Sequence, residues 1–299
     1  MRNWRAGRVP VSGGFLTFHR TGGDGPPLVL SHGLTDNGLC WSRLAAALET
    51  KFDVIMLDAR GHGGSSRLSA PGACDPGQDI AEAIDGLALR APIVIGHSVG
   101  ARATAAYANT PSSRAAKVIL EDPPFLPLVE PSAAEVRARK FREHVERFQT
   151  MSNAEIIASG RVAHALWHDD EFPAWAAAKR QVDPSASPAY TTPWQAQVHQ
   201  ITAPTLLIHG EAKLGSLVTP AIAAEAAALN SNIQFAAIPD AGHNVRRENF
   251  SAYLAALLSF LSATASGPPA LASQCQAGRT KDLLGVTGRR GNRLRPCFD

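Results

Sequence analysis

The sequence predicts an α/β fold, in which strands and helices alternate along one large domain. Short apolar runs rich in β-branched residues, such as 28–30, 52–57 and 91–95, are typical of strands buried on both faces of a sheet. Helix-like segments such as 40–48 separate these runs, and this alternation favours a parallel sheet with crossover helices. A chain of 299 residues is long enough for one such domain with an inserted subdomain.

The predicted elements of the domain follow in order, with no internal repeat. Residues 9–11 and 15–19 form a hairpin through Ser12-Gly13-Gly14, at the antiparallel edge of the sheet. Further strands are expected at 28–30, 52–57, 91–95, 117–122, 205–211 and 233–238, and helices at 40–48, 78–89, 101–108, 220–229 and 248–261.

Between about residues 123 and 200 this alternation gives way to helical patterning. Ser132 and Ser152 are each followed three residues later by a glutamate, which matches the capping box of a helix N-terminus. We therefore expect residues 123–200 to form a helical insertion between two parts of the core.

The composition is that of a soluble globular enzyme. Hydrophobic residues make up 45% of the chain and charged residues 18%, and no apolar run approaches the length of a membrane span. The basic opening residues 1–8 are not followed by the apolar segment of a secretory signal, so we expect a cytoplasmic protein with no membrane partner. The four cysteines lack metal-type spacing, so the sequence implies no disulfide, no metal and no cofactor.

The final stretch, residues 266–299, differs in character from the rest of the chain. Apolar periodicity is absent after Gly267-Pro268-Pro269 near its start, and its six basic side chains face only two acidic ones. Because it lacks interleaved aromatics and any known binding fold, we expect a disordered basic tail rather than a nucleic-acid-binding segment. The oligomeric state is left open.

One motif organises the chain. Gly96-His97-Ser98-Val99-Gly100 reads G-x-S-x-G, after an apolar strand and before an alanine-rich helix. This strand-turn-helix context is that of a nucleophile elbow, where a strained backbone exposes the serine hydroxyl and only small neighbours fit. Ser98 is therefore the candidate nucleophile.

Two further motifs stand at the ends of other strands. Ser31-His32-Gly33-Leu34 precedes the elbow, and Ala241-Gly242-His243 follows the last predicted strand. Together with the elbow, in this order, they resemble the α/β-hydrolase superfamily over about residues 9–262.

The resemblance implies the α/β-hydrolase fold, a mostly parallel, doubly wound eight-stranded sheet with an inserted helical cap. The implied division is a core formed by residues 1–122 and 201–265, with the cap at 123–200. The loop 58–66 matches the D-x-R-G-x-G-x-S turn common in the superfamily, in which Asp58 and Arg60 would fix the loop.

A serine hydroxyl needs a base to take its proton, and a tetrahedral intermediate needs two N–H groups to meet its oxyanion. By the resemblance, His243 is the base, and the backbone N–H groups of Leu34 and Val99 form the oxyanion hole. His32 is expected to brace the loop that carries Leu34.

The third catalytic residue is where the sequence departs from the commonest family pattern. Most members place an acid shortly after the strand that corresponds to 206–208, where this chain offers only Glu211. A minority, including haloalkane dehalogenases and fungal zearalenone lactonases, place it about 24 residues after the nucleophile, where Asp122 stands. Adjacent strands lie close enough for either carboxylate to reach the same imidazole. We favour Asp122 and leave Glu211 open.

The function implied is that of a serine hydrolase that cleaves carboxylic esters through an acyl-enzyme, on an apolar small molecule. Three cap tryptophans, Trp167, Trp175 and Trp194, are the candidate substrate contacts, although each could instead pack the cap's own core. Haloalkane dehalogenases and epoxide hydrolases are set aside because their nucleophile is an aspartate. The alternatives are a lactonase, a carbon–carbon bond hydrolase and a non-catalytic ligand receptor on the same fold.

Overall fold

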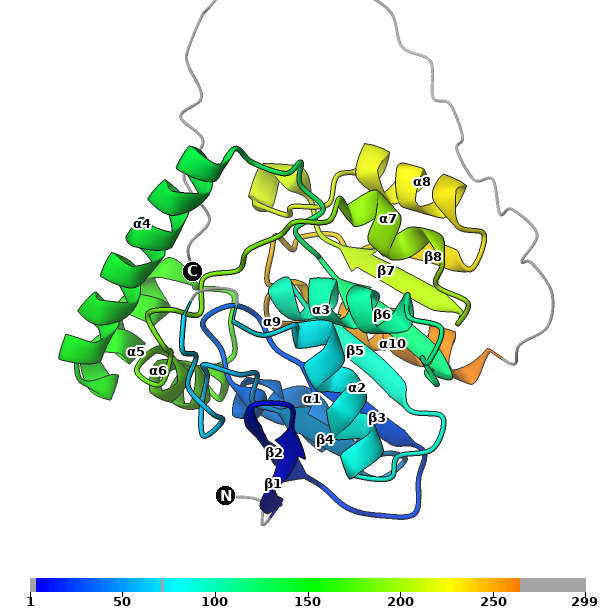
Figure 1. Ribbon diagram of the computed structural model, residues 1–299, viewed down its shortest axis with the longest axis horizontal. Coiled ribbons are helices and arrows are strands. Elements are labelled where there is room, and N and C mark those ends of the chain that lie inside the picture. The colour runs from blue at the N-terminus through cyan, green and yellow to red at the C-terminus, as the bar shows by residue number, and fades with distance from the viewer. Residues whose placement is uncertain (1–3, 71–72, 264–299) are drawn as a thin grey trace, which may run out of the picture.

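The computed structural model describes residues 4–70 and 73–263, and the predicted tail at 266–299 lies outside them. An eight-stranded sheet in the order β1-β2-β4-β3-β5-β6-β7-β8 runs through the centre (Figure 1). The strands are β1 Arg5–Val11, β2 Gly14–Arg20, β3 Pro27–Ser31, β4 Asp53–Leu57, β5 Ile93–His97, β6 Lys117–Glu121, β7 Thr205–His209 and β8 Ile233–Ala237. β2 pairs antiparallel with β1 and β4, and all other pairs are parallel. The predicted sheet and its antiparallel edge hairpin are confirmed.

Helices follow most of the strands. They are the short 3-10 helices η1 Gly38–Trp41 and η2 Ala212–Leu214, and the α-helices α1 Ser42–Leu48, α2 Pro76–Gly86, α3 Val99–Ala108, α4 Pro131–Thr150, α5 Asn153–Ala163, α6 Glu171–Lys179, α7 Trp194–His199, α8 Pro220–Leu229, α9 Val245–Glu248 and α10 Phe250–Ser262. No helix within the described ranges is long and apolar enough to cross a membrane.

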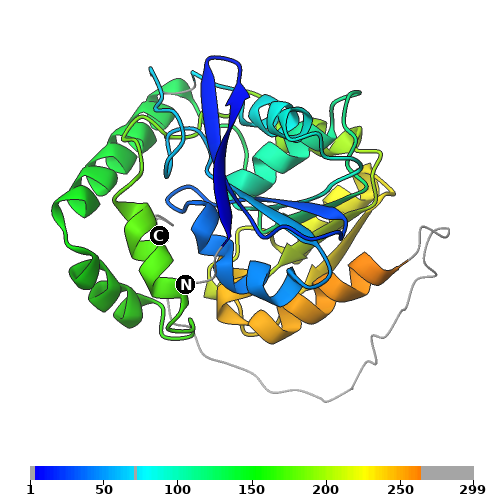
Figure 2. The same cartoon turned by 90° about the horizontal axis from the view of Figure 1, so that it is seen from below.

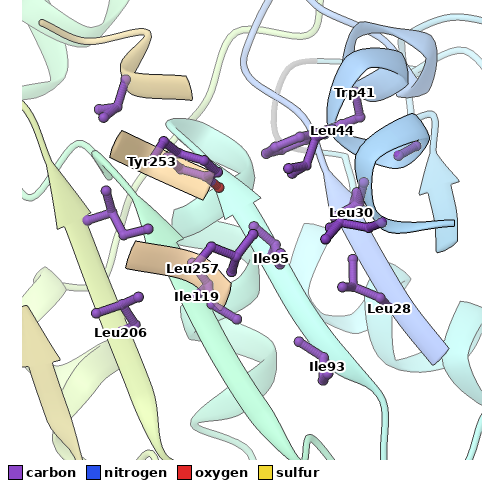
Figure 3. Packing of buried hydrophobic residues seen from close by; sticks show 14 of the residues in the cluster. Leu28, Leu30, Trp41, Leu44, Ile93, Ile95, Ile119, Leu206, Tyr253 and Leu257 are labelled. Carbon is purple, nitrogen blue, oxygen red and sulfur yellow. The ribbon is translucent and has the colours of Figure 1, made fainter. Parts of the chain in front are cut away.

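The hydrophobic core forms on both faces of the sheet because successive strand residues point to opposite sides. On one face, Leu28, Leu30 and Ile95 pack against α1 and α10, with Trp41 and Tyr253 among the fully buried side chains (Figure 3). On the other face, intervening strand residues pack against α2, α3 and α8. The sheet is thus covered on both sides, as parallel sheets require.

The four helices between β6 and β7 do not all lie together. α4, α5 and α6 lie to one side of the sheet in both views (Figures 1 and 2). α7 instead contacts α3 and α8, and its Trp194 and Val198 belong to the core beneath those helices. The α6–α7 linker, residues 180–193, joins the two groups of helices.

The strand order determines where a site can form. β5, β6, β7 and β8 are consecutive neighbours and run parallel, so the loops that follow them lie along one edge of the sheet. Crevices at the carboxyl ends of the strands are where open α/β sheets bind ligands.

Candidate active site

Ser98 occupies a sharp turn between β5 and α3. Its backbone has φ 54° and ψ −122°, a region that L-residues rarely adopt and that stores strain. A Cβ on Gly96 would overlap the carbonyl of Gly100, and a Cβ on Gly100 would overlap the carbonyls of Ser31 and His32. Only glycine fits at both positions, so these two residues allow the elbow to form.

The side chains of Ser98, His243 and Asp122 are joined by hydrogen bonds. His243 Nε2 lies 3.0 Å from Ser98 Oγ, and His243 Nδ1 lies 2.7 Å from Asp122 Oδ2. The three residues come from the ends of β5, β6 and the loop after β8, which the strand order brings together. The arrangement allows His243 to take the proton of Ser98 while Asp122 holds the ring in one tautomer.

Asp122 is buried and accepts three further hydrogen bonds. Ser216 Oγ donates at 2.6 Å, Leu217 N at 2.8 Å and Val218 N at 2.9 Å. These donors stabilise the carboxylate and orient it toward His243. The loop after β7 therefore holds the carboxylate of Asp122 in place, and does not itself supply the acid that contacts His243.

The alternative acid, Glu211, lies elsewhere. Its carboxylate accepts a hydrogen bond from Asp240 N at 2.8 Å and pairs with Lys213 at 2.6 Å, in a partly exposed position. The Lys213 ammonium and the Asp240 N–H lower the pKa of Glu211, which keeps it ionised for that local contact. The geometry therefore favours Asp122 over Glu211 as the partner of His243.

The loop after β3, which carries Leu34, is held by two histidines. His32 accepts a hydrogen bond from Ala59 N at 2.9 Å, so its other ring nitrogen donates to Gly33 O at 2.7 Å. His62 bonds the carbonyl of Leu34. Asp58 adds bonds from Gly38 N and Gly64 N. This loop is therefore braced on both sides.

His97, next to the nucleophile, forms its hydrogen bond with the protein backbone rather than with a catalytic side chain. Its Nε2 donates to the carbonyl of His243 at 3.0 Å, and the two rings lie 4.9 Å apart. Burial lowers the pKa of His97 well below its usual value, which keeps the ring neutral. We infer that His97 positions the backbone of His243.

A cavity of about 970 Å³ opens beside these residues. Ser98 and His243 line it, and so do Leu34 and Val99, the two residues predicted to form the oxyanion hole. Val99 begins α3, whose N-terminus favours negative charge. The apolar wall of the cavity comes from the segment after β6 and the start of α4. The exposed hydrophobic side chains there are Leu126, Leu128, Val129 and Val136.

The three predicted tryptophan contacts lie away from this cavity. Trp167 and Trp175 pack with Phe172 in the core between α5 and α6, and Trp194 stacks on Phe125 at 4.6 Å. Each is less than a tenth exposed, and none lines the cavity. The three tryptophans therefore pack in the protein interior, which was the alternative to substrate contact. The apolar run 125–129 was the signal that could have identified the cavity wall.

A buried charge cluster beside the site has no local sequence signal. Arg246 contacts Glu121 at 3.3 Å, and Arg247 contacts Asp36 at 3.0 Å and Glu171 at 3.3 Å. All five side chains are buried. Because Glu171 begins α6 while the other four residues lie in segments at the edge of the sheet, the cluster joins α6 to those segments.

Two curated relatives match this chain along most of their length. The 2-(acetamidomethylene)succinate hydrolase of Mesorhizobium japonicum is 27% identical over 257 residues, which cover 82% of this chain and 91% of that protein. The N-formylmaleamate deformylase of Pseudomonas putida is 28% identical over 267 residues, which cover 85% of this chain and 96% of that protein.

Solved structures show the same fold at lower identity. A crystal structure of E-2-(acetamidomethylene)succinate hydrolase matches with a TM-score of 0.72 at 24% identity, covering 87% of this chain and all of that one. An esterase from Thermogutta terrifontis matches with a TM-score of 0.68 at 23% identity, covering 86% and 98%. The sequence model of the alpha/beta hydrolase family matches residues 28–257. The chain therefore belongs to the alpha/beta hydrolase family and is an enzyme of the hydrolase class.

Proposed function

We propose that this hydrolase cleaves carboxylic esters of a small, partly apolar molecule through a covalent acyl-enzyme. The observation that carries the proposal is the continuous hydrogen-bonded series from Ser98 through His243 to Asp122, which opens onto a cavity of about 970 Å³. A serine that is hydrogen-bonded to a histidine, which is itself held by a buried aspartate, is suited to nucleophilic attack on a carbonyl.

In the proposed reaction, Ser98 Oγ attacks the ester carbonyl carbon while its proton passes to His243 Nε2. The backbone N–H groups of Leu34 and Val99 stabilise the oxyanion of the tetrahedral intermediate. Asp122 stabilises the imidazolium form of His243 while that form exists. The intermediate then collapses, the carbon–oxygen bond of the ester breaks, and His243 protonates the departing alcohol.

Deacylation repeats these steps with water as the nucleophile. His243 takes a proton from the water as its oxygen attacks the acyl carbon, and the bond to Ser98 Oγ breaks as the hydroxyl regains its proton. The products are an alcohol and a carboxylic acid. The apolar wall at Leu126, Leu128 and Val136 favours a substrate with an apolar portion.

Lactone hydrolysis and carbon–carbon or amide bond cleavage are the second candidates, since the same residues could attack those carbonyls. Support comes from the relatives, which are named as a hydrolase, a deformylase and, over a shorter match, a 3-oxoadipate enol-lactonase. A screen of acyl esters, macrocyclic lactones, β-diketones and N-formyl amides at equal concentration ranks these classes by kcat/KM.

The test of the proposal is hydrolysis of p-nitrophenyl butyrate by the wild type and by Ser98→Ala. Removing the nucleophile is expected to lower kcat by at least about a thousandfold, because the other triad members act only through it. Ser259→Ala, at an exposed serine on α10, is the matched control and keeps the wild-type rate. Retention of most of the activity in Ser98→Ala would overturn the proposal.

A further inference from the structure

A second cavity, of about 540 Å³, adjoins the one at Ser98. The two cavities share the side chains of Leu34 and Val99 and residues 187–191 of the α6–α7 linker as walls. Residues of α2 and α3 line its other side. None of the proposed catalytic steps uses this cavity.

Arg102 lines the second cavity from α3, one turn after Ser98. Only 2% of its surface is exposed, yet its hydrogen-bond acceptors are all neutral. They are the side-chain oxygen of Gln197, the carbonyl of Pro124 at 3.1 Å and the carbonyl of Thr192 at 3.0 Å. Within the described ranges no carboxylate forms an ion pair with Arg102.

Two other arginines that are buried in the described part of the chain, Arg246 and Arg247, have the carboxylate partners that Arg102 lacks there. Arg246 pairs with Glu121, and Arg247 pairs with Asp36 and Glu171. A guanidinium that is removed from water without an opposite charge carries an uncompensated desolvation cost. Burial accordingly lowers the pKa of Arg102. An anion in the adjoining cavity would offset that cost.

Tyr190, on the α6–α7 linker, supplies a second unused group. Its ring lies 4.3 Å from the guanidinium carbon of Arg102, and its hydroxyl oxygen is buried with no hydrogen-bond partner in the described part of the chain. Burial raises the pKa of Tyr190, so the hydroxyl stays protonated and able to donate. The guanidinium likewise carries more N–H groups than its three hydrogen bonds use.

We propose that the second cavity is a subsite for a carboxylate group, with Arg102 as its counter-ion and the Tyr190 hydroxyl as a further donor. A carboxylate matches the planar geometry of a guanidinium and accepts several hydrogen bonds. Because the subsite shares a wall with the active site, the carboxylate can be the far end of the substrate or a separate small acid. Only this connection to substrate rests on the proposed ester hydrolysis.

Binding is tested directly on the full chain with succinate as the probe and the neutral succinamide as its comparison. Succinate is expected to raise the Tm of the wild type and to bind measurably by calorimetry, and succinamide is not. Arg102→Gln is expected to weaken succinate binding at least about tenfold, since a charge-assisted contact is lost. Arg139→Gln removes an equal charge from an exposed position on α4 and keeps the wild-type affinity.

Tyr190→Phe provides an independent variant, because it removes the hydroxyl while keeping the ring over Arg102. It is expected to weaken succinate binding about threefold to tenfold. If Arg102→Gln does not fold, this variant and the wild-type comparison of succinate with succinamide still decide the question. Equal responses to the two ligands would overturn the proposal. The proposal would also be overturned if Arg137→Gln, at a residue that lines the active-site cavity, loses succinate binding while Arg102→Gln keeps it in full.

Kinetics with two esters identify the source of the carboxylate. If it belongs to the substrate, the ratio of kcat/KM for the p-nitrophenyl hemiester of succinate to that for the butyrate ester falls at least about tenfold in Arg102→Gln and stays constant in Arg139→Gln. If it is a separate acid, succinate alters butyrate hydrolysis without competing with it, and this effect disappears in Arg102→Gln. The subsite would be overturned if the enzyme hydrolyses the butyrate ester but does not bind succinate, does not respond to it and does not prefer the hemiester. The proposed function would then remain intact.

Discussion

At the residue scale, two adjacent carboxylates at the end of β6 have different partners. Asp122 bonds His243, whereas Glu121 bonds Arg246 N at 3.0 Å and pairs with its guanidinium. Alternation along the strand turns the two side chains to opposite sides. Asp122 also has a φ of 40°, an uncommon conformation for a residue other than glycine, which marks the end of the strand.

We expect Asp122→Asn to lower kcat by about a hundredfold or more. The amide no longer fixes the tautomer of His243 or stabilises its imidazolium form. The measurement is kcat for p-nitrophenyl butyrate, with Glu211→Gln as the matched control, which costs less than about tenfold because Glu211 contacts Lys213 and Asp240. The reverse order of the two variants would place the acid after β7.

We expect Glu121→Gln to act on stability rather than catalysis. The substitution removes the nearer of the two carboxylates that pair with the buried Arg246 guanidinium, the other being Asp36 at 3.7 Å, and breaking a buried pair in this way costs up to about 3–5 kcal/mol. Urea unfolding measures this loss, while kcat at a temperature where the variant is folded changes less than about tenfold. A loss of kcat as large as that of Asp122→Asn, with unchanged stability, would contradict this assignment.

At the element scale, helix ends and buried charges determine how the segments meet. Of the two predicted capping boxes, the one at Ser152 is confirmed, with both reciprocal bonds to Glu155 present. The one at Ser132 is wrong, because α4 begins at Pro131 and places Ser132 inside the helix. Proline is well suited to the first helical position, because a backbone N–H at that position would have no acceptor within the helix and its absence costs no hydrogen bond.

The pH dependence of stability is expected to follow Asp36. Although burial opposes ionisation, Arg247 and Arg246 hold the pKa of Asp36 well below its usual value. A depressed folded-state pKa means that the stabilisation is complete above the unfolded value of about 3.9 and is lost as the pH falls toward the folded value. Asp36→Asn should therefore reduce the unfolding free energy at pH 7, and its difference from the wild type should shrink below about pH 4.

Urea unfolding between pH 7 and pH 3 checks this expectation. Asp24→Asn, at an exposed aspartate before β3, is the control and should differ little from the wild type over the whole range. A difference between wild type and Asp36→Asn that stays constant across this range would contradict the role given to the charge cluster.

At the scale of the whole molecule, the active-site cavity is formed by segments far apart in the chain. Its lining comes from the loops after β3, β5, β6, β7 and β8, the start of α4 and the α6–α7 linker. The cluster of Asp36, Arg247 and Glu171 fastens α6 to these core loops. Access to Ser98 thus depends on how the helices after β6 are attached to the core.

We expect truncation after residue 265 to leave activity and solubility nearly unchanged. Ser98, Asp122, His243 and the cavity residues all precede this point, and the sequence beyond it lacks apolar periodicity. The rate of ester hydrolysis should be preserved, and Tm should change by less than about 2 °C, which corresponds to less than about 1 kcal/mol for a domain of this size. A large drop in Tm would show that residues 266–299 dock on the core.

The sequence by itself determined the features that depend on near neighbours along the chain. Apolar runs identified the strands, and the glycines around Ser98 identified the elbow, because strand burial and a strained turn leave signatures within a few residues. The order of the motifs, together with the family resemblance, was enough to name Ser98 and His243. It also favoured Asp122, but Glu211 stayed open because either strand end could reach the histidine.

Only the tertiary structure decided which distant side chains meet. The order β5-β6-β7-β8 and the bonds from Ser216, Leu217 and Val218 turn Asp122 toward His243. The burial of Arg102 without a carboxylate partner among the described residues, and the packing of the three tryptophans away from the cavity, depend on how helices dock on the sheet. Composition and periodicity specify that a side chain is buried somewhere, but its partners follow from contacts between segments that the sequence does not place side by side.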